Sequence, residues 1–170
     1  SKFHILSARD PSNVSVKQQF TLHKTVASLL KYEFDMVVIA SAASEHLNHF
    51  EKFIDKGIPI FVEKPVAASA RDAKRMQSLS KNAAIDPVVG YNIRFSSAFR
   101  EVQKIVQNNK LGKLLSVHAV VGQNLQTWRP GRDLNDTVSV SRAKGGGVLR
   151  ELSHEFDYLS TLFGEIVDGY

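Results

Sequence analysis

The first half of the chain alternates short apolar runs with amphipathic stretches. Runs of strand length occur at residues 3–6, 35–40, 59–62 and 87–91. Stretches with apolar residues at helical spacing occur at residues 25–32, 44–56 and 69–81. The 35–40 run is apolar throughout, which is typical of a strand covered on both faces. This succession predicts an α/β fold with a doubly wound parallel sheet.

Boundary residues support two of these helices. Ser44 is a predicted N-cap of the second helix, and Gly57 is its predicted stop. The apolar stripe of this helix consists of Leu47, Phe50, Phe53 and Ile54. Ser69, followed by Asp72 three residues later, predicts a capped start for the third helix.

The pattern changes after Arg94. A helix is predicted over residues 97–109, a strand over 114–121, and a further helix that ends near Gly164. The polar stretch of residues 123–144 between them is predicted to be a long, functional loop. We therefore expect two domains. Residues 1–94 would form the parallel sheet with its helices, and residues 95–170 would begin a second domain.

Composition limits the possible functions. Hydrophobic residues make up 43% of the chain, no apolar run approaches the length of a membrane span, and cysteine is absent. We expect a soluble cytoplasmic protein without membrane contacts. The formal net charge of +5 is spread over the predicted helices, so nucleic acid is not an expected partner. His46 and His49 lack a convincing third ligand nearby, and no metal site is predicted.

Polar residues directly follow the predicted strands. Open parallel sheets bind ligands beyond the carboxyl ends of their strands, so these residues mark the predicted binding edge. They are Ala8-Arg9-Asp10, Ser41-Ala42-Ala43, Glu63-Lys64-Pro65 and Asn92-Ile93-Arg94.

Several motifs together resemble the Gfo/Idh/MocA oxidoreductases, the family of glucose-fructose oxidoreductase and inositol dehydrogenase. In chain order they are Val38-Ile39-Ala40-Ser41 with His46, Glu63-Lys64-Pro65, Gly90 to Phe95, Leu111-Gly112, and Gly145-Gly146-Gly147 through His154 and Asp157. The resemblance covers nearly the whole chain. It implies that residues 1–94 are a partial Rossmann-like dinucleotide-binding domain and that residues 95–170 begin an α+β substrate domain. It implies a nicotinamide cofactor, NADP or NAD, and a small-molecule sugar substrate.

The resemblance also implies missing ends. The family's first strand and glycine-rich turn are expected before Ser1, and most of its second sheet after Tyr170. Without that turn, the helix N-terminus that holds the pyrophosphate is absent, so we expect the isolated chain to bind cofactor poorly and to be inactive. For the full-length protein the resemblance implies a homo-oligomer, a dimer or a tetramer.

Two catalytic residues follow from the resemblance, and helix spacing adds Glu151 as a third candidate. It places Lys64 beside the nicotinamide and the substrate hydroxyl, and His154 on the catalytic helix as the acid/base. Many members carry an aspartate four residues before this histidine, where this chain has Arg150. Glu151, three residues before His154, lies on an adjoining part of the same predicted helix face. It is either a catalytic partner or an ordinary surface carboxylate.

Further contacts are predicted with cofactor and substrate. The predicted cofactor-binding residues are Ala8, Arg9, Ser41, Ala42, His46, Glu63, Lys64, Asn92, Trp128 and Arg129. The predicted substrate-binding residues are Arg94, Lys144 and Asp157, and Arg94 is alternatively a brace between the domains. Ala8 falls where NAD-preferring folds place an acid, and Arg9 follows it, which favours NADP. Asp10 is the alternative acid if the register differs by two.

The predicted activity is oxidation of a hydroxyl on a sugar or sugar derivative, or reduction of the corresponding ketone. Two alternatives share this fold. One is a non-catalytic dinucleotide-binding regulator or scaffold, and the other is a glycosidase that uses bound NAD for transient oxidation. The presence of both Lys64 and His154 favours an oxidoreductase over the non-catalytic alternative.

Overall fold

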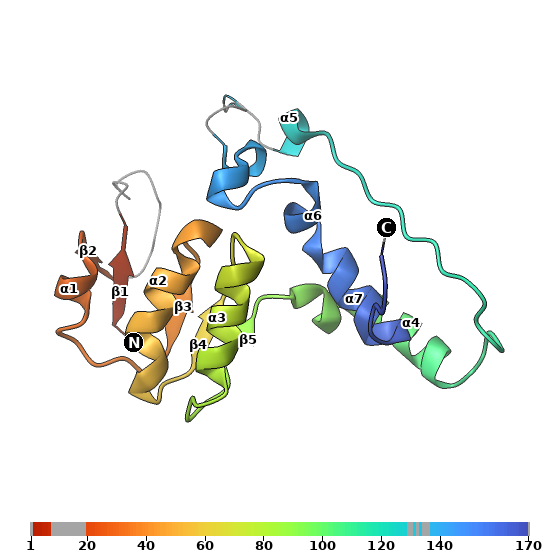
Figure 1. Ribbon diagram of the computed structural model, residues 1–170, viewed down its shortest axis with the longest axis horizontal. Helices are drawn as coiled ribbons and strands as arrows, with labels where there is room; N and C mark the ends of the chain where they lie inside the picture. The colour runs from red at the N-terminus through yellow and green to blue at the C-terminus, as the bar shows by residue number, and fades with distance from the viewer. Residues whose placement is uncertain (1, 8–19, 129–130, 132, 134–136, 170) are drawn as a thin grey trace.

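The strands form two parallel sheets at one end of the molecule (Figure 1). The computed structural model describes residues 2–7, 20–128, 131, 133 and 137–169. One sheet pairs β1 (Phe3–Leu6) with β2 (Phe20–His23), and the other has the order β3 (Val37–Ile39), β4 (Ile60–Val62), β5 (Val88–Val89). The predicted parallel, Rossmann-like sheet is confirmed, whereas β2 was not predicted.

Helices connect the parallel strands. They are α1 (Val26–Leu29), α2 (Ala43–Phe53), the 3₁₀ turn η2 (Ile54–Lys56) and α3 (Ala70–Ser80). The predicted cap of α3 is confirmed, because the Ser69 hydroxyl accepts from the Asp72 N–H at 3.1 Å. The predicted cap of α2 is wrong: the helix begins one residue before Ser44, and Ala42 precedes it without a side-chain cap. Gly57 ends η2 in the left-handed conformation with φ 66°.

Only one face of the three-stranded sheet is covered by described residues. The register places Val38, Phe61 and Val88 in one row across the sheet, and Ile39, Val62 and Val89 in the next. Ile39 and Val62 are buried in a core with residues of α2 and α3, whereas Val38 and Val88 are each 55% exposed. The expectation that β3 is covered on both faces is therefore not met. Helices α2 and α3 pack beside one another against a single face (Figure 1).

The second part of the described chain is helical. Its elements are η3 (Asn92–Phe95), α4 (Ser97–Gln107), α5 (Leu125–Trp128), η5 (Val138–Val140), η6 (Arg142–Lys144), α6 (Val148–Glu151) and α7 (Ser153–Phe163). The predicted strand over residues 114–121 is wrong. This segment is extended, with Leu115 87% and Val120 97% exposed, but no described strand lies alongside to satisfy its backbone.

The predicted last helix is divided in two. Helix α6 ends at Glu151, and Leu152 departs from helical geometry with φ −100° and ψ 32° before α7 begins. Glu151 and His154 therefore lie on different helices, and the predicted sharing of one helix face is wrong. The predicted end is confirmed, since Gly164 follows the last residue of α7 with φ 98°.

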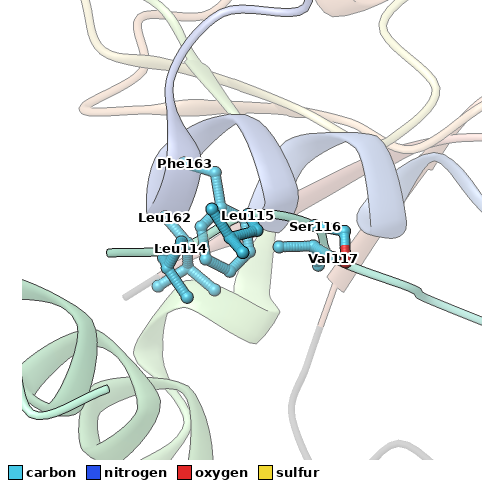
Figure 2. A pocket seen from close by; sticks show the side chains of 6 residues that line it. All are labelled: Leu114, Leu115, Ser116, Val117, Leu162 and Phe163. Carbon is cyan, nitrogen blue, oxygen red and sulfur yellow. The ribbon is translucent and has the colours of Figure 1, made fainter. Parts of the chain in front are cut away.

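A shallow apolar hollow lies at the end of α7 (Figure 2). Leu114, Leu115 and Val117 of the extended segment face Leu162 and Phe163 of the helix. Eight residues separate His154 from Leu162, which is about 12 Å along a helix. The hollow is thus remote from the polar residues at the start of α7. None of the described helices is long and apolar enough to cross a membrane.

Candidate active site

Lys64 connects the sheet to the last two helices. It lies two residues after β4, and its Nζ donates a hydrogen bond to the Glu151 carbonyl oxygen at 2.7 Å. Its own backbone N–H donates to Glu63 Oε2 at 3.1 Å. The Lys64 side chain is 17% exposed, and the Lys64–Pro65 peptide bond is cis. The ammonium group is therefore held between two segments that are 87 residues apart in sequence.

The Glu151 carboxylate lies beside the same ammonium group. Glu151 Oε2 is 4.0 Å from Lys64 Nζ, which is ion-pair range but too long for a hydrogen bond. The side chain is 16% exposed, so this carboxylate is not an ordinary surface group. The geometry pairs Glu151 with Lys64, where the sequence had suggested His154 as its partner.

The first turn of α7 carries polar atoms without partners. Ser153 Oγ, His154 Nδ1 and Glu155 Oε2 are buried, and none has a hydrogen-bond partner among the described residues. An unsatisfied buried polar atom costs about 1–3 kcal/mol. The His154 ring lies edge to face with Tyr91, with centroids 5.7 Å apart. Tyr91 follows β5 and Gly90, and the sequence analysis did not assign it a role. A polar ligand at this turn would relieve the unpaired atoms.

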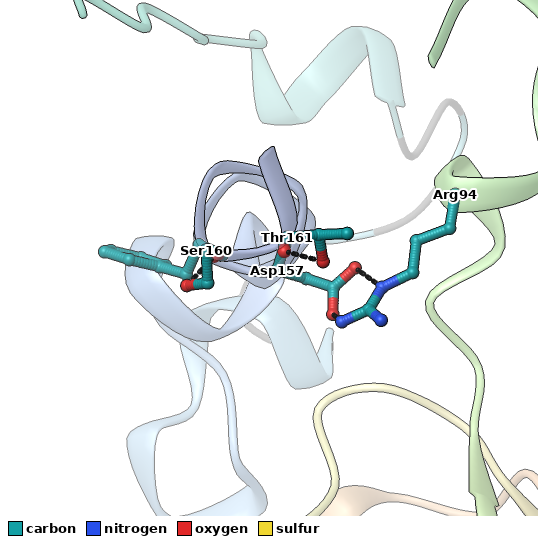
Figure 3. A network of polar contacts seen from close by, with 5 residues as sticks. Arg94, Asp157, Ser160 and Thr161 are labelled. Carbon is teal, nitrogen blue, oxygen red and sulfur yellow. Dashed lines mark hydrogen bonds and ion pairs between the residues drawn. The ribbon is translucent and has the colours of Figure 1, made fainter. Parts of the chain in front are cut away.

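Arg94 and Asp157 form a two-pronged ion pair across the same junction (Figure 3). Arg94 Nε donates to Asp157 Oδ2 at 2.7 Å, and Arg94 Nη2 donates to Oδ1. This hydrogen bonding raises the pKa of Arg94 above its ordinary value. The Asp157 carboxylate is 6% exposed and the Arg94 side chain 45%. The geometry favours the predicted alternative in which Arg94 braces η3 against α7.

Replacing Arg94 by methionine is expected to destabilise the full-length protein by about 1–2 kcal/mol. The change leaves the Asp157 carboxylate without its charged partner, while the exposure of Arg94 keeps the loss at the lower end for charged hydrogen bonds. Urea unfolding measures the difference. Arg75→Met is the matched control, because the Arg75–Glu51 pair has both side chains well exposed and is expected to contribute under about 1 kcal/mol. Equal losses in the two variants would contradict a bracing role for Arg94.

The carboxyl end of β3 carries a polar cluster of three residues. Ser41 Oγ lies 3.0 Å from His49 Nδ1. Burial lowers the pKa of His49, the Glu45 carboxylate opposes this shift, and His46 adds to it. A neutral His49 ring can accept a hydrogen bond from the Ser41 hydroxyl group and so orient that hydroxyl group. His46 is 1% exposed, and its two ring nitrogens lie 3.0 Å from the Ser41 carbonyl oxygen and 3.2 Å from that of Val66.

A glycine packs the long loop against this edge. A Cβ atom on Gly145 would lie 2.8 Å from the Ala43 Cβ and 3.2 Å from the Ala68 Cβ. The segment of residues 137–147 therefore meets the start of α2 and the loop after β4 through small residues. Lys144, the neighbouring residue, is exposed. This close packing of Gly145 against Ala43 and Ala68 was not predicted from the sequence.

Gly145→Ala is expected to cost more stability than Gly147→Ala. Both glycines have positive φ values, 92° and 113°, so an alanine at either position strains the backbone by about 1–3 kcal/mol. Only at Gly145 does the added methyl group also collide with a neighbour, which adds about 1–3 kcal/mol. Chemical denaturation of the two full-length variants gives the comparison. If Gly147→Ala were the more damaging change, the packing of the loop on α2 would be refuted.

Of the remaining predicted residues, three lie in the described part and three do not. Asn92 is exposed at the start of η3, Ala42 is half-buried before α2, and Trp128 is half-buried at the end of α5. Ala8, Arg9 and Arg129 lie outside the described residues.

Arg150, which stands where many family members have an aspartate, has a structural contact instead. Its guanidinium group donates to the carbonyl oxygens of Arg142 and Gly146 at 3.2 Å and 3.3 Å. It therefore braces the loop before α6.

The residues present suit a dinucleotide and a hydroxylated substrate. The carboxyl ends of β3, β4 and β5 supply a serine hydroxyl, the Lys64 ammonium group and the Asn92 amide, which are donors for ribose hydroxyls and a carboxamide. The unpaired atoms at the start of α7 offer further polar contacts. No group of three or more His, Cys, Asp or Glu side chains in the described residues is arranged to hold a metal ion.

The fold and this edge define a dinucleotide-binding domain joined to a second, helical part. Comparison with known families agrees: residues 3–91 match the oxidoreductase family with an NAD-binding Rossmann fold, and residues 99–169 match the GFO/IDH/MocA C-terminal domain. The chain belongs to the Gfo/Idh/MocA oxidoreductase family.

Two curated relatives illustrate the range of the family. A 1-carboxy-3-chloro-3,4-dihydroxycyclohexa-1,5-diene dehydrogenase of Comamonas testosteroni is 24% identical over 98% of this chain and 43% of its own length. An inositol 2-dehydrogenase of Rhizobium meliloti is 26% identical over 78% of this chain and 38% of its own length. The chain thus spans less than half the length of both relatives.

A solved structure shares the fold. Levoglucosan dehydrogenase, in complex with NADH and levoglucosan, superposes with a TM-score of 0.68 at 21% identity. The match covers 85% of this chain and 39% of the other.

Proposed function

We propose that this chain belongs to an enzyme that transfers hydride between a nicotinamide cofactor and a hydroxyl-bearing carbon of a sugar or cyclic polyol. The observation that carries the proposal is the link from Lys64 Nζ to the Glu151 carbonyl oxygen, which brings a cation from the sheet to the end of α6, directly before the helix that carries His154. Relatives named for inositol and levoglucosan support this class of substrate.

The proposed cofactor contacts lie at the carboxyl ends of the strands. Ser41, Ala42, Glu63 and Asn92 would bind the dinucleotide there, together with Trp128 and Arg129 of the long loop. The sequence Ala8-Arg9 favours NADP over NAD as the physiological cofactor. When bound, the nicotinamide supplies the hydride acceptor or donor.

Lys64 and His154 would act on the substrate hydroxyl. An ammonium group has three N–H donors, and the Glu151 carbonyl takes one of them, which leaves two for the substrate oxygen. His154 would take the hydroxyl proton as the carbon–oxygen bond becomes a carbonyl, and return it in the reverse direction. The Glu151 carboxylate would help to hold the Lys64 ammonium group in place.

The second part of the chain would bind the rest of the substrate. We propose that residues 1–94 form the dinucleotide domain and residues 95–170 the start of the substrate domain. The Lys64–Glu151 and Arg94–Asp157 contacts then join the two domains. Lys144, which is exposed, would contribute polar contacts to the substrate, while Arg94 and Asp157 hold the junction.

The test is a fluorescence titration of the full-length protein with NADPH and NADH, followed by assays against a panel of sugars and cyclic polyols. The expected result is tight binding, with NADPH preferred, and reduction of the oxidised cofactor by at least one member of the panel. An intact protein that binds neither cofactor would overturn the proposal. Binding without turnover of any panel member would favour a non-catalytic relative.

A further inference from the structure

His46 bridges the two loops that follow the neighbouring strands β3 and β4. It lies in the first part of α2 and is 1% exposed. Its Nε2 lies 3.0 Å from the Ser41 carbonyl oxygen, two residues after β3, and its Nδ1 lies 3.2 Å from the Val66 carbonyl oxygen. Val66 is two residues after Lys64. One ring therefore contacts both the β3 loop and the loop that carries the proposed active-site lysine.

The two carbonyl oxygens hold this ring between the loops. A carbonyl oxygen only accepts hydrogen bonds, so a ring nitrogen bonds to one only by donating an N–H group. The ring lies within hydrogen-bond distance of both carbonyl oxygens and therefore links the two loops.

We infer that His46 is a positioning residue that ties the Lys64 loop to the β3 loop. Because this ring is buried, its place is behind the cofactor edge, which replaces the expectation of direct contact with the cofactor. Loss of the bridge would let Val66 shift and would move Lys64 from its substrate. The kinetic part of this inference rests on the proposed oxidoreductase function.

The test compares three variants of the full-length protein. His46→Phe keeps an aromatic ring but removes both ring nitrogens, and His46→Gln retains an amide donor for one of the carbonyl oxygens. Phe50→Leu is the matched control, because Phe50 is one turn further along α2, equally buried, and contacts the apolar core. A displacement of about 1 Å can cost 10²-fold in rate. We expect His46→Phe to lower kcat by about 10- to 100-fold with cofactor affinity retained.

His46→Gln should recover part of that loss, while Phe50→Leu lowers Tm and leaves kcat unchanged. One readout does not need turnover. Acylation of Lys64 by acetic anhydride, followed by mass spectrometry, should be faster in His46→Phe than in wild type and unchanged in Phe50→Leu.

The outcomes separate this inference from the proposed function. A wild type with no turnover defeats the proposed function, and the acylation result then decides the bridge alone. A kcat or a Lys64 acylation rate in His46→Phe that matches Phe50→Leu overturns the inference.

Discussion

Replacing His154 by asparagine is expected to lower kcat by about 10²- to 10⁴-fold, the usual contribution of a general acid/base. Asparagine is similar in size and can form hydrogen bonds, but it cannot take up the hydroxyl proton. The buried, unpaired Nδ1 of His154 places this side chain where a polar ligand is needed. Steady-state kinetics of the full-length protein, with cofactor affinity measured separately, gives the result.

His118→Asn is the control for that change. His118 lies in the exposed segment between α4 and α5, and this variant should have wild-type kinetics. A His154→Asn protein that folds, binds cofactor and retains full kcat would exclude His154 as the acid/base.

Lys64→Met is expected to lower kcat by about 10²- to 10³-fold, as removal of one preorganised donor to a reacting oxygen does. Methionine has a similar length and flexibility but no charge and no N–H donor. It also leaves the Glu151 carboxylate without its neighbouring cation. Rates with saturating substrate and cofactor measure the loss.

The matched control for Lys64 is Lys52→Met on the exposed side of α2. This variant removes the same charge and should leave kcat unchanged. If Lys64→Met and Lys52→Met had the same kcat, the loss of the Lys64 ammonium group would have no effect beyond the loss of one positive charge. That result would remove Lys64 from the proposed mechanism.

The sequence predicted the order of elements well where local signals determine them. Ser69 caps α3 because its hydroxyl reaches the Asp72 N–H, a contact within one turn. The strand over residues 114–121 failed because a strand needs a neighbour, and its apolar residues are exposed in the described chain. The break at Leu152 also carried no sequence signal, since its neighbours all have ordinary helical propensity.

The candidate site was predicted through topology. Because parallel strands end at one edge, Ser41, Lys64 and Asn92 could be grouped from the sequence alone. The partners of these residues could not, because they depend on contacts between distant segments. The Glu151 carbonyl oxygen that accepts the Lys64 hydrogen bond is 87 residues away in sequence. The Val66 carbonyl oxygen that His46 contacts is 20 residues away.

Transfer of deuterium tests the central claim most directly. The full-length protein would be incubated with oxidised cofactor and with sugars or cyclic polyols that carry deuterium on each hydroxyl-bearing carbon, and the reduced cofactor would be analysed by mass spectrometry. Our account predicts one deuterium on the nicotinamide, with transfer strongly reduced in Lys64→Met and His154→Asn. A protein that binds the cofactor and acquires no label from any substrate would contradict it.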